Sequence, residues 1–248
     1  MSKRIHILNC PIDALTMEET LEQINDAIIS RNHIQHVVVN AAKIVMMQKD
    51  KNLAEAIEGS DIINVDGQAV VWASKLLKQP LPERVAGIDL MSKLVEMSHK
   101  KGYRIFFLGA RQDVIQKVIA KYRAQYGDSI IAGYKDGYFS KSEEHAVVEE
   151  ISKSNADILF VAIPSPQKEL FLNQYSQHLG VPFIMGVGGS FDVISGQIKR
   201  APLWMQKYGM EWFFRLIQEP RKMWKRYLFT NISFILLLLR HMIKKGTM

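Results

Sequence analysis

Short β-rich runs alternate with amphipathic segments along most of the chain, and this alternation restricts the fold more than any other feature of the sequence. Strands separated by helix-length segments indicate right-handed βαβ crossovers and a mostly parallel sheet. We therefore expect a Rossmann-like α/β body with helices on both faces of the sheet. The predicted strands are 36–40, 61–65, 103–108, 129–132, 158–162 and 182–185, and the predicted helices between them include 70–77 and 112–126.

The charge of the chain is concentrated at its C-terminal end. Residues 200–248 contain ten Lys or Arg and two Asp or Glu, whereas the whole chain of 248 residues has a net charge of +7. The first 199 residues are therefore almost neutral, with a net charge of −1. A neutral body with a basic, apolar tail is typical of a soluble domain held against an anionic surface.

The apolar run in this tail is predicted to lie on a membrane and not to cross it. Arg226 and Arg240 bracket the run, which is shorter than the roughly 20 apolar residues that a membrane span needs. Such a basic amphipathic helix favours the interfacial plane of an anionic membrane. Its apolar stripe would consist of Trp224, Leu228, Ile232, Ile235, Leu239 and Met242.

Two other interpretations of the tail remain open. It could be an ordinary amphipathic helix packed on the core or on a second copy of the chain, which would make the protein a homo-oligomer. Nucleic acid is a weaker candidate partner, because no zinc spacing, aromatic-studded strand or recognition helix accompanies the basic residues. Residues 1–199 thus form the expected α/β catalytic domain, and residues 200–248 the expected helical membrane-associating appendage.

The N-terminal segment and the cysteine content indicate the cytoplasm. Residues 1–9 are basic but lead into a short strand pattern, without the long apolar core of a signal peptide. The single cysteine, Cys10, cannot form an internal disulfide and is expected to be a small core residue. We expect a cytoplasmic protein that is peripheral to the inner face of the cell membrane.

Polar residues and glycines follow the predicted strands, where open α/β sheets bind ligands. Asp66 follows a buried strand, so its carboxylate could act as a general base with a raised pKa. Asp is equally a favoured helix N-cap, and the local sequence by itself favours that structural role. The other residues at predicted strand ends are Asn40, Gly109, Ser165 and Gly188.

The segment 186–192, Gly-Val-Gly-Gly-Ser-Phe-Asp, is similar to a turn that binds phosphate through backbone N–H groups. It lacks the third glycine and downstream acidic residue of a dinucleotide fingerprint. Arg84, in a proline-rich loop, could bind a phosphate, although a solvated surface arginine is the plainer explanation. No His, Cys and Asp cluster has metal-ligand spacing. Phosphate chemistry here would depend on arginines and backbone amides.

Several ordered segments together resemble the WecG/TagA/CpsF family of glycosyltransferases, glycosyltransferase family 26. The resemblance covers nearly the whole chain. It implies transfer of a hexose-type sugar from a UDP-sugar to a polyprenyl-diphosphate-linked saccharide, with inversion, without metal or cofactor, in bacterial surface polysaccharide synthesis. The matching segments are 66–67, 84–90, 136–139, 186–192, 195–196, 199–202, 209–212 and 215–220.

The resemblance also implies roles for individual residues. Asp66 would be the base, and Asn40 would help to hold the donor or the acceptor. Phosphates would contact Arg84, Arg215 and Arg221, with Arg226 a weaker candidate. The remaining substrate-binding candidates are Gly109, Gln167, Lys168, Gly188 and Gly189.

Two positions depart from the family pattern. Val38 stands where many members have Thr, and Lys168 replaces a glutamine that would face the donor. Lys168 could pair with a phosphate or another acidic group. Both changes suggest a donor other than the common N-acetylmannosamine type, such as a glucose- or uronate-type sugar.

Two alternatives belong to other functional classes. A non-catalytic adapter of a polysaccharide assembly complex would bind a nucleotide sugar or lipid without turnover. A Rossmann oxidoreductase would bind NAD(P), and the missing fingerprint disfavours it.

Overall fold

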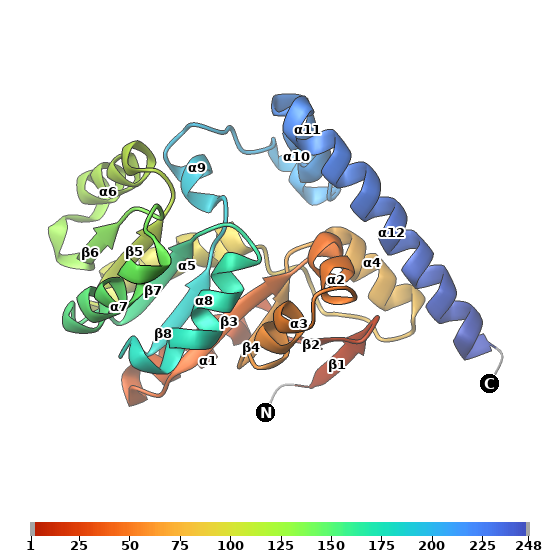
Figure 1. Ribbon diagram of the computed structural model, residues 1–248, viewed down its shortest axis with the longest axis horizontal. Coiled ribbons are helices and arrows are strands. Elements are labelled where there is room, and N and C mark those ends of the chain that lie inside the picture. Colours follow the sequence, from red (N-terminus) through yellow and green to blue (C-terminus); the bar gives the residue numbers. More distant parts are fainter. Residues whose placement is uncertain (1–2, 247–248) are drawn as a thin grey trace.

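The computed structural model describes residues 3–246, and within that range it does not describe the side chains of Lys222, Arg226 and Lys245. Six parallel strands form the central sheet in the order β4-β3-β8-β7-β5-β6 (Figure 1). The predicted parallel sheet is confirmed. Its strands are β3 (Ile34–Val39), β4 (Ile62–Val65), β5 (Ile105–Gly109), β6 (Ile131–Lys135), β7 (Ile158–Ala162) and β8 (Phe183–Gly186).

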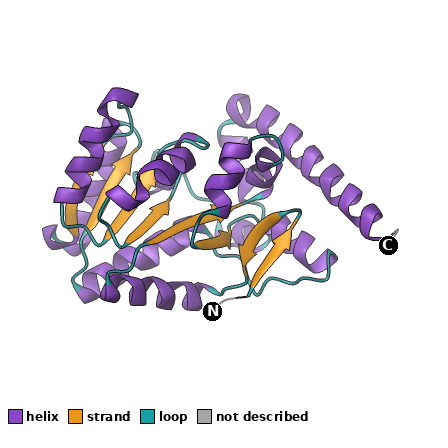
Figure 2. Ribbon diagram, turned by 60° about the horizontal axis from the view of Figure 1, so that its bottom comes forward, coloured by secondary structure: helices purple, strands orange, loops and turns teal. Residues whose placement is uncertain are grey.

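Helices cover both faces of the sheet because its strands carry apolar side chains on both faces (Figure 2). Neighbouring residues of a strand point to opposite faces, so Phe107 packs with α1, α5 and α6, and Phe106 with α7 and α8. The helices of the body are α1 (Met17–Ser30), α2 (Ala41–Met47), α3 (Lys51–Glu58), α4 (Gln68–Leu76), α5 (Gly87–Lys101), α6 (Gln112–Tyr126), α7 (Glu144–Lys153), α8 (Gln167–Tyr175) and α9 (Ser190–Ile194), with 3-10 turns at Asp128–Ile130, Lys141–Glu143 and Ser176–His178.

The N-terminal segment forms a hairpin, of which the sequence predicted only a short strand. Strands β1 (Arg4–Ile7) and β2 (Cys10–Asp13) pair antiparallel through a turn in which Leu8 and Asn9 both have positive φ. The sequence lacks the glycine that usually marks such a turn. Cys10, the first residue of β2, is fully buried, which confirms its predicted place in the core.

Helix α5 begins inside the segment 84–90, which resembles the family. The sequence pattern at 84–90 predicts a turn that leads into a helix ending near Lys101, but the helix already begins at Gly87. Ala86 provides the extended N-cap conformation, and Val85 and Leu90 are buried in the core. The buried side chains therefore hold a helical start that the sequence pattern did not reveal.

The last three helices form the appendage: α10 (Leu203–Lys207), α11 (Glu211–Gln218) and α12 (Pro220–Gly246). Figure 1 shows α12 as a long helix alongside α2 and α4. Phe234 is only 4% exposed and joins the core cluster that includes Ile44 of α2. The interpretation that the tail docks on the core is thus correct for this face of α12.

The opposite face of α12 is exposed and apolar. Five residues of the predicted stripe, Trp224, Leu228, Ile232, Ile235 and Leu239, are each about half exposed. The window Met223–Lys244 is long and apolar enough to cross a membrane by length and composition. The expectation that the run is too short to span is therefore wrong on length, because the helix continues past Arg240. A core helix of a soluble protein can meet the same criterion of length and composition, so this criterion alone does not show that α12 crosses a membrane.

Candidate active site

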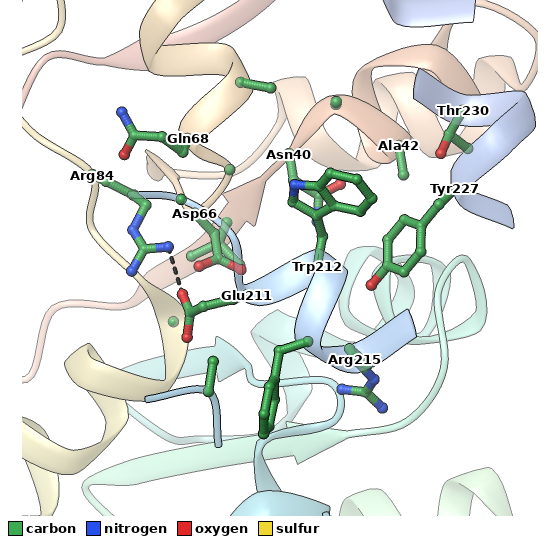
Figure 3. A pocket seen from close by; sticks show the side chains of 18 of the residues that line it. Asn40, Ala42, Asp66, Gln68, Arg84, Glu211, Trp212, Arg215, Tyr227 and Thr230 are labelled. Carbon is green, nitrogen blue, oxygen red and sulfur yellow. Dashed lines mark hydrogen bonds and ion pairs between the residues drawn. The ribbon is translucent and has the colours of Figure 1, made fainter. Parts of the chain in front are cut away.

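Two cavities meet at the carboxyl ends of the parallel strands. The first, of about 650 Å³, lies between α4, α11 and α12, and we call it the α4–α12 cavity (Figure 3). The second, of about 1560 Å³, surrounds the turn after β8, and we call it the glycine-turn cavity. Asn40, Asp66, Gly189 and Arg215 line both cavities. The strand-end position predicted for the site is therefore where the structure has its cavities.

Asp66 lies where the two cavities join. Its backbone N–H donates to the carbonyl of Val39, which fixes the start of the loop after β4. The N-cap of α4 is Gly67, without a side-chain capping bond, so the capping interpretation of Asp66 is wrong. The carboxylate is left to face the cavities.

The surroundings of Asp66 suit a general base. Burial raises the pKa of its carboxyl above the ordinary value, and the negative charge of Glu211 raises it further. Arg84, the backbone N–H of Gly87 and Lys43 oppose this shift without cancelling it. A carboxylate with a raised pKa accepts a proton more readily than an exposed one.

Asn40 has a structural role as well as a place in the site. Its side chain caps α2 by accepting a 3.0 Å hydrogen bond from the backbone N–H of Lys43. A Cβ at Gly67 would lie 2.9 Å from the Asn40 Cβ. The turns after β3 and β4 thus pack closely, which keeps Asn40 beside Asp66.

Arg84 connects the body to the appendage. Its Nη1 lies 2.5 Å from Oε2 of Glu211 on α11, as the dashed line in Figure 3 marks. Arg200 binds Asp89 through two hydrogen bonds of 2.6 and 2.7 Å and also contacts Glu211. Arg84 is therefore not a solvated surface arginine, and Glu211 holds α11 against the body.

The glycine turn and Arg215 come together from distant parts of the sequence. Gly188 has a φ of +53°, a conformation that favours glycine. A Cβ on Gly189 would lie 3.2 and 3.4 Å from the two terminal nitrogens of Arg215. The guanidinium thus lies directly over the turn that is predicted to bind phosphate.

A buried group of charges forms one wall of the glycine-turn cavity. Glu169 Oε1 lies 2.9 Å from Nζ of Lys43 and 3.3 Å from Nζ of Lys168, and it accepts a 2.9 Å hydrogen bond from Ser165. Burial alone would raise the pKa of Glu169, but the two lysines lower it to about 2. The group therefore has two cations and one anion.

Lys168 crosses the floor of the glycine turn. A Cβ at Gly186 would lie 2.5 Å from the Lys168 Cε, and one at Gly188 would lie 3.8 Å from its Nζ. The residue that departs from the family pattern thus presents its ammonium group beside the glycine turn. Val38, the other departure, lines both cavities.

Not every predicted site residue lines a cavity. Gly109 lines neither cavity, and it faces the Ala162 backbone. Arg221 is exposed at the start of α12, outside both cavities, whereas Gln167 is exposed and lines the glycine-turn cavity. Arg226 lies in α12, but its side chain is outside the described residues.

Several lining residues were not predicted as part of the site. Glu211 lies one helical turn before Arg215, a spacing that could have revealed it. Tyr227 and Thr230 lie on one side of α12 at a helical spacing. No sequence spacing marks Lys43 as a site residue, because its burial depends on an ion pair with Glu169 of another helix. Among the residues described, no group of three or more His, Cys, Asp or Glu side chains is placed to hold a metal ion.

Comparison with known proteins shows the family of this chain. The fold and the strand-end site define a Rossmann-like α/β protein with a helical appendage over its site. The profile described as "Glycosyl transferase WecG/TagA/CpsF family" matches residues 5–247. The chain therefore belongs to this glycosyltransferase family.

Two curated relatives have similar sequences. An N-acetylglucosaminyldiphosphoundecaprenol N-acetyl-beta-D-mannosaminyltransferase of Bacillus subtilis (strain 168) is 41% identical over 180 residues, which cover 73% of this chain and 69% of the relative. The protein of the same name from Bacillus spizizenii is 38% identical over 172 residues, or 69% of this chain and 66% of the relative. The match thus spans about two thirds of each relative.

Proposed function

We propose that the protein transfers a sugar from a UDP-sugar to a polyprenyl-diphosphate-linked saccharide, with inversion at the anomeric carbon, in bacterial surface polysaccharide synthesis. The observation that supports this most is the position of Asp66 at the junction of two cavities of different character. The names of both relatives describe transfer to a diphosphoundecaprenol-linked acceptor sugar.

In this proposal the acceptor hydroxyl attacks C1 of the donor sugar and transfers its proton to the Asp66 carboxylate. The bond between C1 and the diphosphate oxygen breaks, and UDP leaves with the bonding electrons. Preorganised cations stabilise such developing negative charge strongly in a site that excludes water. Arg215, over Gly188 and Gly189, has the position for this role.

The glycine-turn cavity is the proposed donor site. It combines the turn with Lys43 and Lys168, which share the single carboxylate of Glu169. Asp192 and Glu219 also line this cavity, so position and not net charge is decisive: the Lys168 ammonium group lies beside the turn, where it suits a diphosphate or an acidic sugar. We therefore propose a glucose- or uronate-type donor sugar, although the names of the relatives specify an N-acetylmannosaminyl group.

We also propose that the protein acts at the cytoplasmic face of the membrane with α12 lying in the interface. Tyr227, Thr230 and Phe234 of α12 line the same cavity as Asp66, so this part of the helix stays beside the body. A helix held in this way cannot simultaneously extend across a bilayer. Its exposed apolar stripe is free to enter the membrane interface.

The test is a transfer assay with a panel of UDP-sugars and a short-chain polyprenyl-diphosphate-GlcNAc acceptor. UDP release should require both substrates, and mass spectrometry should identify the glycosylated lipid. Asp66→Asn should lower the rate by about 10²–10⁴-fold, because it removes the base, while donor affinity stays unchanged. Unchanged turnover in this variant would exclude Asp66 as the base. Binding of a UDP-sugar without turnover on any acceptor would favour the adapter.

A further inference from the structure

We infer that the α4–α12 cavity is a groove for the first isoprene units of the acceptor lipid, entered from the membrane side. The inference rests on the proposed function, because that function supplies an isoprenoid diphosphate as substrate. It adds the place on this chain where the lipid binds.

The outer walls of the groove are apolar and come from two helices. Ala69, Trp72, Ala73 and Leu76 of α4 form one wall, and Phe234, Ile235 and Leu238 of α12 form the other. These side chains offer no hydrogen-bonding groups for a sugar or a diphosphate, apart from the indole N–H of Trp72. The lining also includes the polar residues Gln68, Tyr227, Thr230 and Asn231, which precede these apolar residues on the two helices. A volume of about 650 Å³ is within the range of small-molecule sites. The chemistry of the walls therefore suits a hydrocarbon chain.

The inner end of the groove is charged, and cations outnumber anions among the residues that line it. The charged residues that line the cavity are the cations Arg84, Lys199, Arg200 and Arg215 and the anions Asp66 and Glu211. Asp89 and Glu219, which do not line this cavity, pair with Arg200 and Arg215. An apolar channel with a cationic end matches an amphiphile with an anionic head. The diphosphate would lie among the arginines, close to the base, and the hydrocarbon would lie between α4 and α12.

The outer end of the groove opens onto the exposed apolar surface of α12. Trp72, Leu76 and Ile235 line the cavity and are each more than half exposed. Ile235 also belongs to the exposed stripe, with Ile232 and Leu239 as its neighbours one turn away. A lipid leaving the groove would therefore meet the face of α12 that is proposed to lie in the membrane.

Binding of farnesyl diphosphate, compared with inorganic diphosphate, tests the groove without membranes and without a donor. Quenching of tryptophan fluorescence is a suitable measurement, because Trp72 and Trp212 both line the cavity. We expect farnesyl diphosphate to bind at least about 10-fold more tightly, since burial of each methylene adds affinity. Equal affinity for the two ligands would overturn the inference.

Two neighbouring residues provide a matched pair of variants. Ile235 and Leu236 lie on α12 with exposed fractions of 55% and 48%, but only Ile235 lines the groove. Ile235→Glu should abolish the farnesyl advantage, the tighter binding of farnesyl diphosphate relative to inorganic diphosphate, because burying a carboxylate beside hydrocarbon is unfavourable. Its affinity for inorganic diphosphate should stay within about 2-fold of the wild-type value. Leu236→Glu should preserve the advantage. Equal losses in both variants would indicate non-specific adsorption and overturn the inference.

A third variant tests the groove without adding charge. Ala69→Leu should narrow the groove and weaken farnesyl diphosphate binding, with the affinity for inorganic diphosphate again unchanged.

If the farnesyl advantage and the matched-pair difference are observed but no transfer occurs, the proposed function fails and the lipid site stands. If transfer occurs but Ile235→Glu and Leu236→Glu bind farnesyl diphosphate like the wild type, the groove inference fails and the proposed function stands.

Discussion

At the scale of single residues, the acidity of Asp66 depends on charges from three parts of the chain. Burial and Glu211 raise the pKa of its carboxyl, whereas Arg84 and Lys43 lower it. Glu211 belongs to the appendage, and Arg84 and Lys43 belong to the body. The appendage therefore influences the proposed base electrostatically as well as covering it.

Glu211→Gln should lower the pKa of Asp66, since it removes a negative charge beside the carboxylate and frees Arg84 to interact with it. The base is active when ionised, so activity should fall as pH decreases through this pKa. In the wild type, we expect kcat/KM to fall with decreasing pH at a value above the usual pKa range of Asp. In Glu211→Gln, we expect this fall at a lower pH. Glu96→Gln, at an exposed pair with Lys100, is the control. A fall at the same or a higher pH in Glu211→Gln would contradict the proposed electrostatics.

Two glycines illustrate the difference between a folding role and a site role. Gly109 has a φ of +119°, and a Cβ there would lie 2.5 to 2.8 Å from backbone atoms of Ala162. Gly109→Ala should therefore destabilise the fold by about 2–5 kcal/mol through backbone strain and overpacking. Gly189→Ala meets only the flexible end of Arg215, so it should change stability by less than about 1 kcal/mol and mainly alter donor binding. Urea unfolding and donor titration of both variants would separate these effects.

At the scale of elements, the ion group of Lys43, Lys168 and Glu169 joins α2 to α8 beside the glycine-turn cavity. All three side chains are less than 10% exposed. Removing the shared carboxylate would leave two buried cations without their counterion. This wall is therefore expected to matter for stability as well as for charge.

Glu169→Gln should destabilise the protein by about 3–5 kcal/mol, the usual cost of breaking a buried ion pair. Because the folded-state pKa of Glu169 is lowered to about 2, its stabilising effect is present above the unfolded value of 4.5. The effect should be lost as pH falls from 4.5 towards 2. Urea unfolding at several pH values measures the difference, with the exposed Glu149→Gln as control. A difference that does not shrink in acid would contradict this account.

At the scale of the whole molecule, the exposed apolar side chains of the appendage form one membrane-binding surface in our proposal. The triple variant Leu228→Glu, Ile232→Glu, Leu239→Glu should reduce sedimentation with vesicles that contain anionic lipid by at least about 10-fold. These residues are about half exposed, so the fold should be retained. Ile29→Glu, at an exposed apolar residue of α1, should bind like the wild type. Undiminished binding of the triple variant would exclude the stripe as the membrane contact.

The positions of Asp66 and Asn40 could be predicted from the sequence because parallel strands end at one edge of a sheet. Asp66 and Asn40 each follow a strand, so their proximity needed no knowledge of side-chain packing. The roles of Arg84 and Glu211 were less accessible. Their contact joins residues 127 positions apart and depends on how the appendage docks.

The sequence by itself determined the parallel α/β body, the strand-end location of the candidate site and the local concentration of basic residues. Hydrophobic periodicity and charge are local properties, and they restrict these features without reference to distant contacts. The tertiary structure decided which face of α12 is buried on α2, which residues pair with Arg84 and how far α12 extends. It also decided that Asp66 faces a cavity and does not cap α4. These outcomes depend on the packing of distant segments, which no local pattern specifies.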